Sequence, residues 1–109
     1  MRVIILPEVI DYFLELASLF YDKGYFGFEY NAVQYARELF EEIRDNLPTK
    51  HKKVAPEYFD KYGEGLFYAV FRRNKNTSWY VFFNIYQTGG EVVYFVRYVS
   101  NNHVIAQYL

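Results

Sequence analysis

Hydrophobic residues are densest between Leu66 and Val99, where three runs of aromatic and β-branched residues alternate with two short polar stretches. The runs span residues 66–73, 79–86 and 92–99, and the stretches between them carry the Asn, Ser and Gly residues that chain reversals favour. Such closely connected runs predict three consecutive strands that pair as an antiparallel meander. Because the runs are apolar on both faces, we expect helices to cover one face and a partner or the C-terminal tail to cover part of the other.

The residues before the meander begin with a strand and a helix. Residues 2–6 form a short apolar run that ends at Pro7, and proline suits the first position of a helix because no backbone N–H is needed there. From about Pro7 to Asp22, apolar residues recur at spacings of three and four. This spacing predicts a helix with one buried side.

A second helix is expected after a glycine-containing break at residues 23–27. Asn31 is a favourable N-cap with Gln34 three residues later, and apolar residues at helical spacing continue to Leu47, just before Pro48. Two helices joined this closely form a helical hairpin. We therefore expect the hairpin to cover one face of the sheet.

The length of the chain, 109 residues, suits a single domain. Residues 48–65 contain two prolines and two glycines and are expected to form a connecting loop. Residues 100–109 are too few for an independent element and should pack along the sheet or dock on a neighbour. The predicted fold class is therefore α+β, a single domain over residues 1–109 with a helical hairpin packed on an antiparallel β-sheet.

The composition is globular and rich in aromatic residues, with 52% hydrophobic and 23% charged residues, 13 Tyr and 11 Phe. A β-rich core and a tyrosine-rich interface both explain the aromatic residues. Cysteine is absent and there are two histidines, so the sequence predicts no disulfide, no metal site and no cofactor. No apolar run approaches the roughly 20 residues that span a bilayer, and the first residues do not resemble a secretory signal. We therefore expect a cytoplasmic protein that does not contact a membrane.

The net charge of −1 is divided unevenly along the chain. Residues 1–49 carry four basic and nine acidic side chains, whereas residues 50–109 carry eight basic and four acidic ones. The densest positive charge lies in the connector, at Lys50, Lys52 and Lys53. This cluster is consistent with a solvated loop and with a phosphate-contacting surface.

Three short motifs accompany this order of elements. Leu6-Pro7-Glu8 leads into the first helix, Phe71-Arg72-Arg73 ends the second predicted strand, and Val96-Arg97-Tyr98 lies in the last one. With its order of strand, helical hairpin, basic loop, three-stranded meander and short tail, the chain resembles the RelE/ParE family of toxins from bacterial type II toxin–antitoxin modules, the plasmid stabilisation proteins. The resemblance covers most of the chain. It implies a small toxin, held inactive by an antitoxin protein, that either cuts mRNA on the ribosome or, in the ParE branch, blocks DNA gyrase.

The chain departs from the family pattern in its cations. Many members begin the third strand with an arginine, whereas Trp79 and Tyr80 stand there in this chain. The last strand often leaves through a basic segment, and here residues 100–102 are neutral. These departures bear more on nuclease activity than on the fold.

Metal-free RNA cleavage by a ribose 2′-hydroxyl requires a base, cations near the phosphate and an acid for the leaving oxygen. The resemblance implies Arg72 as one catalytic cation, and Arg97 is the candidate for a second. His103 is the acid/base candidate of the tail because a histidine side chain titrates near neutral pH. Tyr108 is a candidate proton donor.

The alternation of side chains along a strand limits which cations can act together. Arg72 and Arg73 face opposite ways, so at most one of them joins Arg97 on a given face. On a regular strand, Arg97 would share its side with Val93, Phe95 and Val99. The expected RNA-binding residues are four cations and one aromatic residue that can stack on a base. They are Lys50, Lys52, Lys53, Arg73 and Tyr98.

The alternative to an endoribonuclease is a protein that binds a partner without chemistry. Exposed aromatic residues on the sheet and an apolar tail would suit an antitoxin, DNA gyrase or a second copy in a homodimer, and an inactive relative of the toxins is a third option. Convergence of Arg72, Arg97 and His103 on one concave surface would favour catalysis. Scattered or salt-bridged arginines would favour binding.

Overall fold

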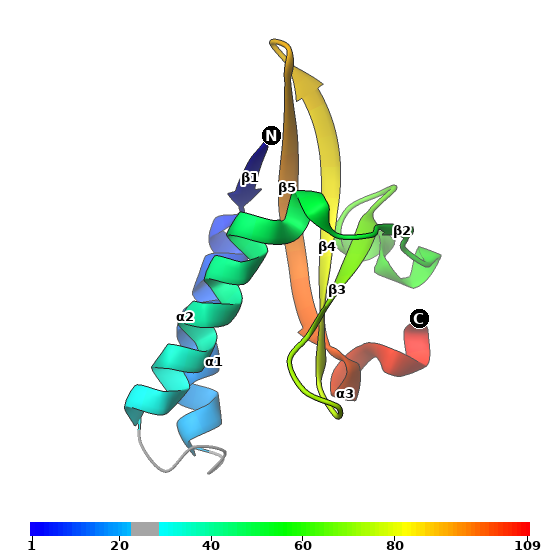
Figure 1. Cartoon of the computed structure of the whole chain (residues 1–109). Coiled ribbons are helices and arrows are strands. Elements are labelled where there is room, and N and C mark those ends of the chain that lie inside the picture. Colours follow the sequence, from blue (N-terminus) through cyan, green and yellow to red (C-terminus); the bar gives the residue numbers. More distant parts are fainter. Residues whose placement is uncertain (23–28) are drawn as a thin grey trace.

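The computed structural model describes residues 1–22 and 29–109, and these form a mixed α/β fold with a five-stranded sheet (Figure 1). The strand order is β1-β5-β4-β3-β2. The strands are β1 (Arg2–Ile5), β2 (Lys53–Val54), β3 (Phe67–Arg72), β4 (Ser78–Thr88) and β5 (Glu91–Asn101). The predicted α+β class is therefore confirmed at this level.

The sheet is only partly antiparallel, contrary to the expectation from the sequence. β3, β4 and β5 pair consecutively as the predicted antiparallel meander, but β1 pairs with β5 in parallel. An apolar run predicts a strand without giving its direction, because direction depends on the path of the connection. The connection after β1 runs through both helices before the chain returns to the sheet at its opposite edge.

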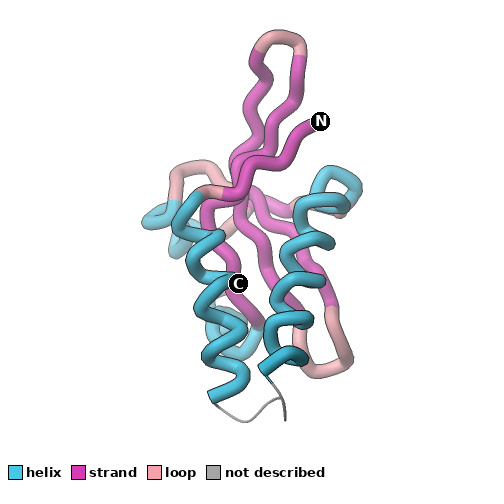
Figure 2. Tube along the Cα trace, turned by 90° about the vertical axis from the view of Figure 1, so that its left-hand side faces the viewer, coloured by secondary structure: helices cyan, strands magenta, loops and turns pink. Residues whose placement is uncertain are grey.

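The β4–β5 hairpin is longer than predicted and extends beyond the helices (Figure 2). A two-residue turn at Gly89 and Gly90 joins the strands, with φ values of 57° and 78°. Positive φ at both central turn residues suits a tight hairpin turn, and glycine adopts it without a steric cost.

The two helices are α1 (Pro7–Asp22) and α2 (Glu29–Asn46), and they lie side by side on one face of the sheet (Figures 1 and 2). α2 begins two residues before Asn31, so the expected N-cap is wrong. Asn31 is exposed within the first turns, where buried Ala32 and Ala36 fix the helix against the core. The predicted break at residues 23–27 lies outside the described residues.

The face under the helices holds the larger hydrophobic core. Apolar side chains of both helices meet alternate residues of the central strands there. The main contributors are Val9, Phe13, Leu16, Leu39 and Ile43 from the helices and Ala69, Phe71, Val81, Phe83, Val96 and Val99 from the sheet. The hydrophobic periodicity of the sequence predicts this packing, except that Ile10, Leu14 and Val33 of the two apolar stripes are exposed.

The opposite face, which we call the open face, is covered by short segments. Phe59, Leu66, Phe82 and Ile105 form a second buried cluster there. The connector predicted as a loop contains β2 and two 3₁₀ segments, η1 (Leu47–Thr49) and η2 (Glu57–Tyr62). The tail forms α3 (Asn102–Ile105) and η3 (Ala106–Tyr108) and packs on the sheet. Elements of one or two turns are too short to show a hydrophobic period, so the sequence did not predict them.

A β-bulge changes the direction of the side chains in β5. Phe82 pairs with Tyr98 and Phe83 pairs with Val96, so Arg97 is the extra residue of the bulge. Tyr98 consequently packs on the open face, whereas Val99 belongs to the core under the helices. The expectation that Arg97 shares its side with Val99 is therefore wrong, because it assumed regular alternation.

The described residues include no candidate for a membrane-spanning helix. None of the helices there is both long enough and apolar enough to cross a bilayer.

Candidate functional site

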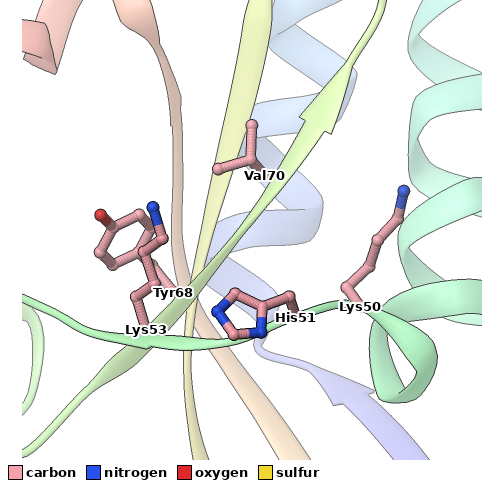
Figure 3. Close-up of a pocket in the computed structure, with 5 residues that line it drawn as sticks. All are labelled: Lys50, His51, Lys53, Tyr68 and Val70. Atoms are coloured by element: carbon pink, nitrogen blue, oxygen red, sulfur yellow. The ribbon is translucent and has the colours of Figure 1, made fainter.

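A pocket of about 240 Å³ opens on the open face beside β3 (Figure 3). Lys50, His51 and Lys53 come from the connector after α2, and Tyr68 and Val70 come from β3. Figure 3 shows His51 between the two lysines, with Tyr68 on the side of Lys53. The five described residues that line the pocket include two ammonium groups, an imidazole and a phenol, and none of them carries a carboxylate.

The register of β2 explains how the connector reaches this position. Lys53 pairs with Tyr68, and Val54 pairs with Phe67, in antiparallel direction. Residues 50–52 therefore continue along the edge of β3 beside residues 69–71. Because side chains alternate along β3, Tyr68 and Val70 face the pocket while their neighbours pack under the helices.

The three predicted phosphate-binding lysines do not all reach the pocket. Lys50 and Lys53 line it, but the ammonium of Lys50 lies 4.7 Å from the centroid of the Phe71 ring, which is buried in the core under the helices. This ammonium therefore points toward the helix side of the sheet edge. Lys52 instead places its ammonium 5.8 Å from the centroid of the Phe67 ring. Phe67 packs against the core under the helices, so Lys52 points to the other side of the sheet edge.

Arg72 continues the row of β3 residues that face the pocket side, two positions after Val70. Its side chain is exposed, and its Nε donates a hydrogen bond to the carbonyl of Asn74 at 3.2 Å. Arg72 pairs with Ser78 across the β3–β4 turn. This position leaves the guanidinium accessible to an anion on the open face.

His103 lies at the same end of the sheet as Arg72. Its Nε2 is 3.2 Å from the Thr77 hydroxyl oxygen. The neighbouring Asn102 side chain accepts a hydrogen bond from the Ser78 N–H at 2.9 Å and donates one to the Asn76 carbonyl at 3.1 Å. These contacts fix the start of the tail to the β3–β4 turn.

Arg97 lies far from these two residues. It donates hydrogen bonds to the side-chain amide oxygen of Asn84 and, at 3.3 Å, to the Tyr86 hydroxyl. Asn84 is six positions beyond Ser78 on β4, which corresponds to about 20 Å along a strand. Arg72, Arg97 and His103 therefore do not converge on one concave surface.

Arg73 occupies the side of the sheet that faces the helices. Its guanidinium lies 3.0 Å from a Glu42 carboxylate oxygen and 3.5 Å from one of Glu38, both on α2. The centre of the guanidinium is 5.0 Å from the centroid of the Tyr35 ring. These contacts connect β3 to α2 and use the charge that was expected to bind RNA.

The two predicted tail and strand tyrosines stack on tyrosines of η2. Tyr108 stacks on Tyr58 and Tyr98 stacks on Tyr62, each with ring centroids 3.7 Å apart. The Lys61 ammonium lies 3.9 Å from the centroid of the Tyr58 ring. The stacking closes the gap between η2 and the tail on the open face.

Hydrogen bonding and burial shift the pKa values of these phenols in opposite directions. The hydrogen bond from Lys61 lowers the pKa of Tyr58, whereas the hydrogen bond to Tyr58 raises the pKa of Tyr108. Desolvation raises the pKa of Tyr62 to about 12. A side-chain hydrogen bond with Tyr98 contributes to this shift, so the Tyr62 hydroxyl is engaged with the neighbouring strand.

His51, Tyr68 and Val70 line the pocket but were not predicted as site residues from the sequence. A signal for His51 was present, since it lies inside the densest basic cluster of the chain. Tyr68 and Val70 were placed in a strand, but which strand face would meet the connector depends on the register of β2. Among the described residues, no three His, Asp or Glu side chains gather into a group that could hold a metal ion.

Comparison with known proteins gives no further assignment. No family model, no curated protein and no solved structure matches this chain.

Proposed function

We propose that this chain is a toxin-like protein of the RelE/ParE type that acts in the cytoplasm and binds RNA on the open face of its sheet. The order of elements supports the proposal. A first strand, a pair of helices, a basic connector, a three-stranded meander and a short tail follow one another in the order that suggested the resemblance. The parallel pairing of β1 with β5 places the helices over one face and leaves the other to short segments.

The basic pocket beside β3 is the observation that carries the proposal. Lys53 supplies positive charge for phosphate oxygens in the pocket, Lys50 adds positive charge at the sheet edge beside it, and the Tyr68 ring supplies a surface for a base. Arg72 extends the positive charge along the same face. Single-stranded nucleic acid is bound by this combination of cations along the backbone and aromatic rings under the bases.

The positions of the arginines favour binding over the catalytic arrangement expected from the sequence. Arg97 is about 20 Å from the Arg72 end of the sheet, and Arg73 is paired with two carboxylates of α2. The proposal therefore places RNA contacts at the pocket and Arg72. An antitoxin that blocks this surface is part of the proposal.

The test combines expression in cells with RNA binding by the purified chain. We expect induced expression without a partner to arrest growth, and we expect the protein to bind a short single-stranded RNA with an affinity that falls as salt rises. The double variant Lys50→Ala/Lys53→Ala should lose both effects. Arg37→Ala removes an exposed cation of α2 and serves as the matched control.

Two results would contradict RNA binding. Growth arrest without RNA affinity would transfer the proposal to a protein target such as gyrase. RNA affinity that responds equally to the pocket and control variants would show that the pocket is not the binding surface.

A further inference from the structure

β1 is the edge strand of the sheet that lies opposite to the edge with the basic pocket. In the strand order it has one neighbour, β5, and it lies at the outside of the sheet, beside the β4–β5 hairpin (Figures 1 and 2). Val3, Ile4 and Ile5 are all partly exposed. An edge strand presents backbone N–H and C=O groups with which another strand can pair.

The two edges of the sheet differ in how they are protected. β2, at the opposite edge, consists of Lys53 and Val54, and Pro56 follows two residues later. Short length, lysine and proline are features with which proteins discourage pairing at an edge. β1 has four residues, of which three are β-branched and suit a strand. β1 is therefore the edge at which a further strand pairs more readily.

The pairing of β1 with β5 fixes which backbone groups face the free edge. The Leu6 N–H donates a hydrogen bond to the Val96 carbonyl at 3.2 Å, so the backbone groups of Leu6 face β5. Because these groups alternate in direction along a strand, those of Val3 and Ile5 face away from β5. Two N–H and two C=O groups are thus directed at the free edge.

We propose that two copies of this chain form a dimer through β1, with the two strands antiparallel about a two-fold axis perpendicular to the sheet. Val3 of each copy lies opposite Ile5 of the other, and each of these two pairs exchanges both backbone hydrogen bonds. Ile4 lies opposite Ile4 of the second copy. In this register the helices of both copies lie on the same face of a continuous sheet made of two five-stranded halves.

The charges beside β1 are self-complementary, which favours a second copy over an unrelated chain. Arg2 lies opposite Leu6 of the second copy in this register, two residues before the exposed Glu8 in the first turn of α1. Opposite charges therefore meet at both ends of the paired strands. The Arg2 Nε lies 3.3 Å from a Glu91 carboxylate oxygen, but both side chains are about half exposed, and such an ion pair contributes little.

The arrangement of the hairpin and α1 is compatible with this pairing. The two elements extend from β1 in opposite directions (Figure 1). The two-fold axis reverses the second copy, so the hairpin of each copy extends in the same direction as α1 of the other. Leu14 of α1 is 71% exposed and offers apolar area on that element. Four paired residues bury less than a standard interface, so we expect a dissociation constant in the micromolar range.

Sedimentation equilibrium of the full chain measures the association. We expect a monomer–dimer equilibrium between about 1 µM and 1 mM. Val3→Pro removes an N–H at the free edge and leaves the hydrogen bonds to β5, since proline is tolerated where an edge strand faces solvent. We expect this variant to raise the dissociation constant about tenfold or more. Val3→Ala keeps the N–H, so it is the matched control and should have a smaller effect.

A single introduced cysteine tests the register, because the chain has no cysteine of its own. Ile4 lies on the two-fold axis, where opposed Cα atoms are about 4.5 Å apart, within the range that a disulfide bridges. We expect Ile4→Cys to form a disulfide-linked dimer under mild oxidation. Val54 at the other edge is 75% exposed. Val54→Cys therefore controls for random collision and should cross-link more slowly.

Circular dichroism of each variant shows whether the fold is retained. If Val3→Pro does not fold, the cysteine variants still test the interface, since they keep the backbone of β1. A monomer at every concentration overturns the proposal and leaves the edge to a different chain. A dimer that Val3→Pro leaves intact overturns it as well, as does cross-linking of Val54→Cys at the rate of Ile4→Cys. RNA binding at the pocket is independent of these outcomes, because the pocket lies at the opposite edge.

Discussion

The two faces of the sheet are closed in different ways. Two long helices cover one face, and their apolar stripes form a continuous core with the central strands. The six residues of η2 and the C-terminal tail cover the other, around a cluster of Phe59, Leu66, Phe82 and Ile105. The smaller cover leaves part of β3 open, and the basic pocket lies there. Stability and the candidate site are therefore concentrated on opposite faces.

The chemistry of the side chains follows the same division. The face under the helices is built mainly from aliphatic and phenylalanine side chains. Tyr62, Tyr68, Tyr80 and Tyr98 pack around the cluster on the open face. Tyrosine combines a large apolar ring with a polar end, so it can line a surface that remains in contact with water. The aromatic composition thus supplies both the core and the site.

Removal of a ring from the helix-covered core should have the largest effect on stability. Phe83 lies in a central strand, is buried in the core under the helices and has the rings of Phe67 and Tyr94 beside it. We expect Phe83→Ala to lower the free energy of unfolding by about 4–5 kcal/mol. Urea denaturation followed by circular dichroism measures this change. A loss below about 1 kcal/mol would show that the helices do not form the main core.

Removal of a ring from the open-face cluster should lower the free energy of unfolding by a smaller amount. Phe59 is also fully buried and stacks on Phe82 with centroids 4.3 Å apart, but it lies in the short η2 segment. Because η2 can move into the cavity, we expect Phe59→Ala to cost about 3 kcal/mol, the low end for such changes. Hydrogen exchange should increase in residues 55–65 more than in the helices. Uniform exchange across both faces would contradict a division into two separate layers.

Substitutions of the adjacent residues Arg72 and Arg73 allow the two faces to be compared directly, because Arg72 lies on the open face and Arg73 on the side of the helices. Arg73→Gln removes the contacts to Glu38 and Glu42, and we expect a loss of about 1–2 kcal/mol, between the values for exposed and buried pairs. Arg72→Gln should change stability by less than about 0.5 kcal/mol, since its side chain is exposed. For RNA affinity we expect the opposite: Arg72→Gln should weaken binding more than Arg73→Gln does. If the two variants had equal effects on stability and equal effects on RNA affinity, Arg72 and Arg73 would not differ in role between the two faces.

The stacking of Tyr108 on Tyr58 should contribute less to stability than the contacts of Arg73 do. Tyr108 is 37% exposed and holds the end of the tail on η2. We expect Tyr108→Ala to cost about 0.5–1.5 kcal/mol, the value of an aromatic pair, while Tyr108→Phe should retain most of it. Thermal unfolding measures both variants. A larger loss for Tyr108→Phe than for Tyr108→Ala would mean that the hydroxyl, and not the ring, matters.

Prediction from the sequence succeeded where an element is long enough to show a period. The stripe of α1 and the three apolar runs of the meander were both assigned correctly. It failed for β2, η2 and the tail helix, which are two to six residues long and, unlike the equally short β1 and β3, do not consist of a continuous apolar run. The parallel direction of β1 was also missed, since direction is a property of the whole path.

The sequence predicted which basic residues belong to the candidate site but not how they are arranged in space. The sequence identified Lys50 and Lys53 as phosphate-binding candidates, and the structure places both in one pocket. Arg97 was grouped with Arg72 as a second catalytic cation, but Arg97 contacts Asn84, which lies about 20 Å along β4 from the Ser78 partner of Arg72. The sequence lacks the register, so distances between strands could not be derived.

The sequence by itself determined which segments are helices and long strands, which faces of them are apolar and where positive charge is dense. Those features depend on residues that are near one another in the sequence and on the regular periods at which side chains face one side of a helix or a strand. The tertiary structure alone decided that β1 is parallel to β5, that Arg97 is a bulge residue, and that His51 and Tyr68 line the same pocket. Each of these depends on the pairing of segments far apart in the chain, where a shift of one residue turns a side chain to the other face.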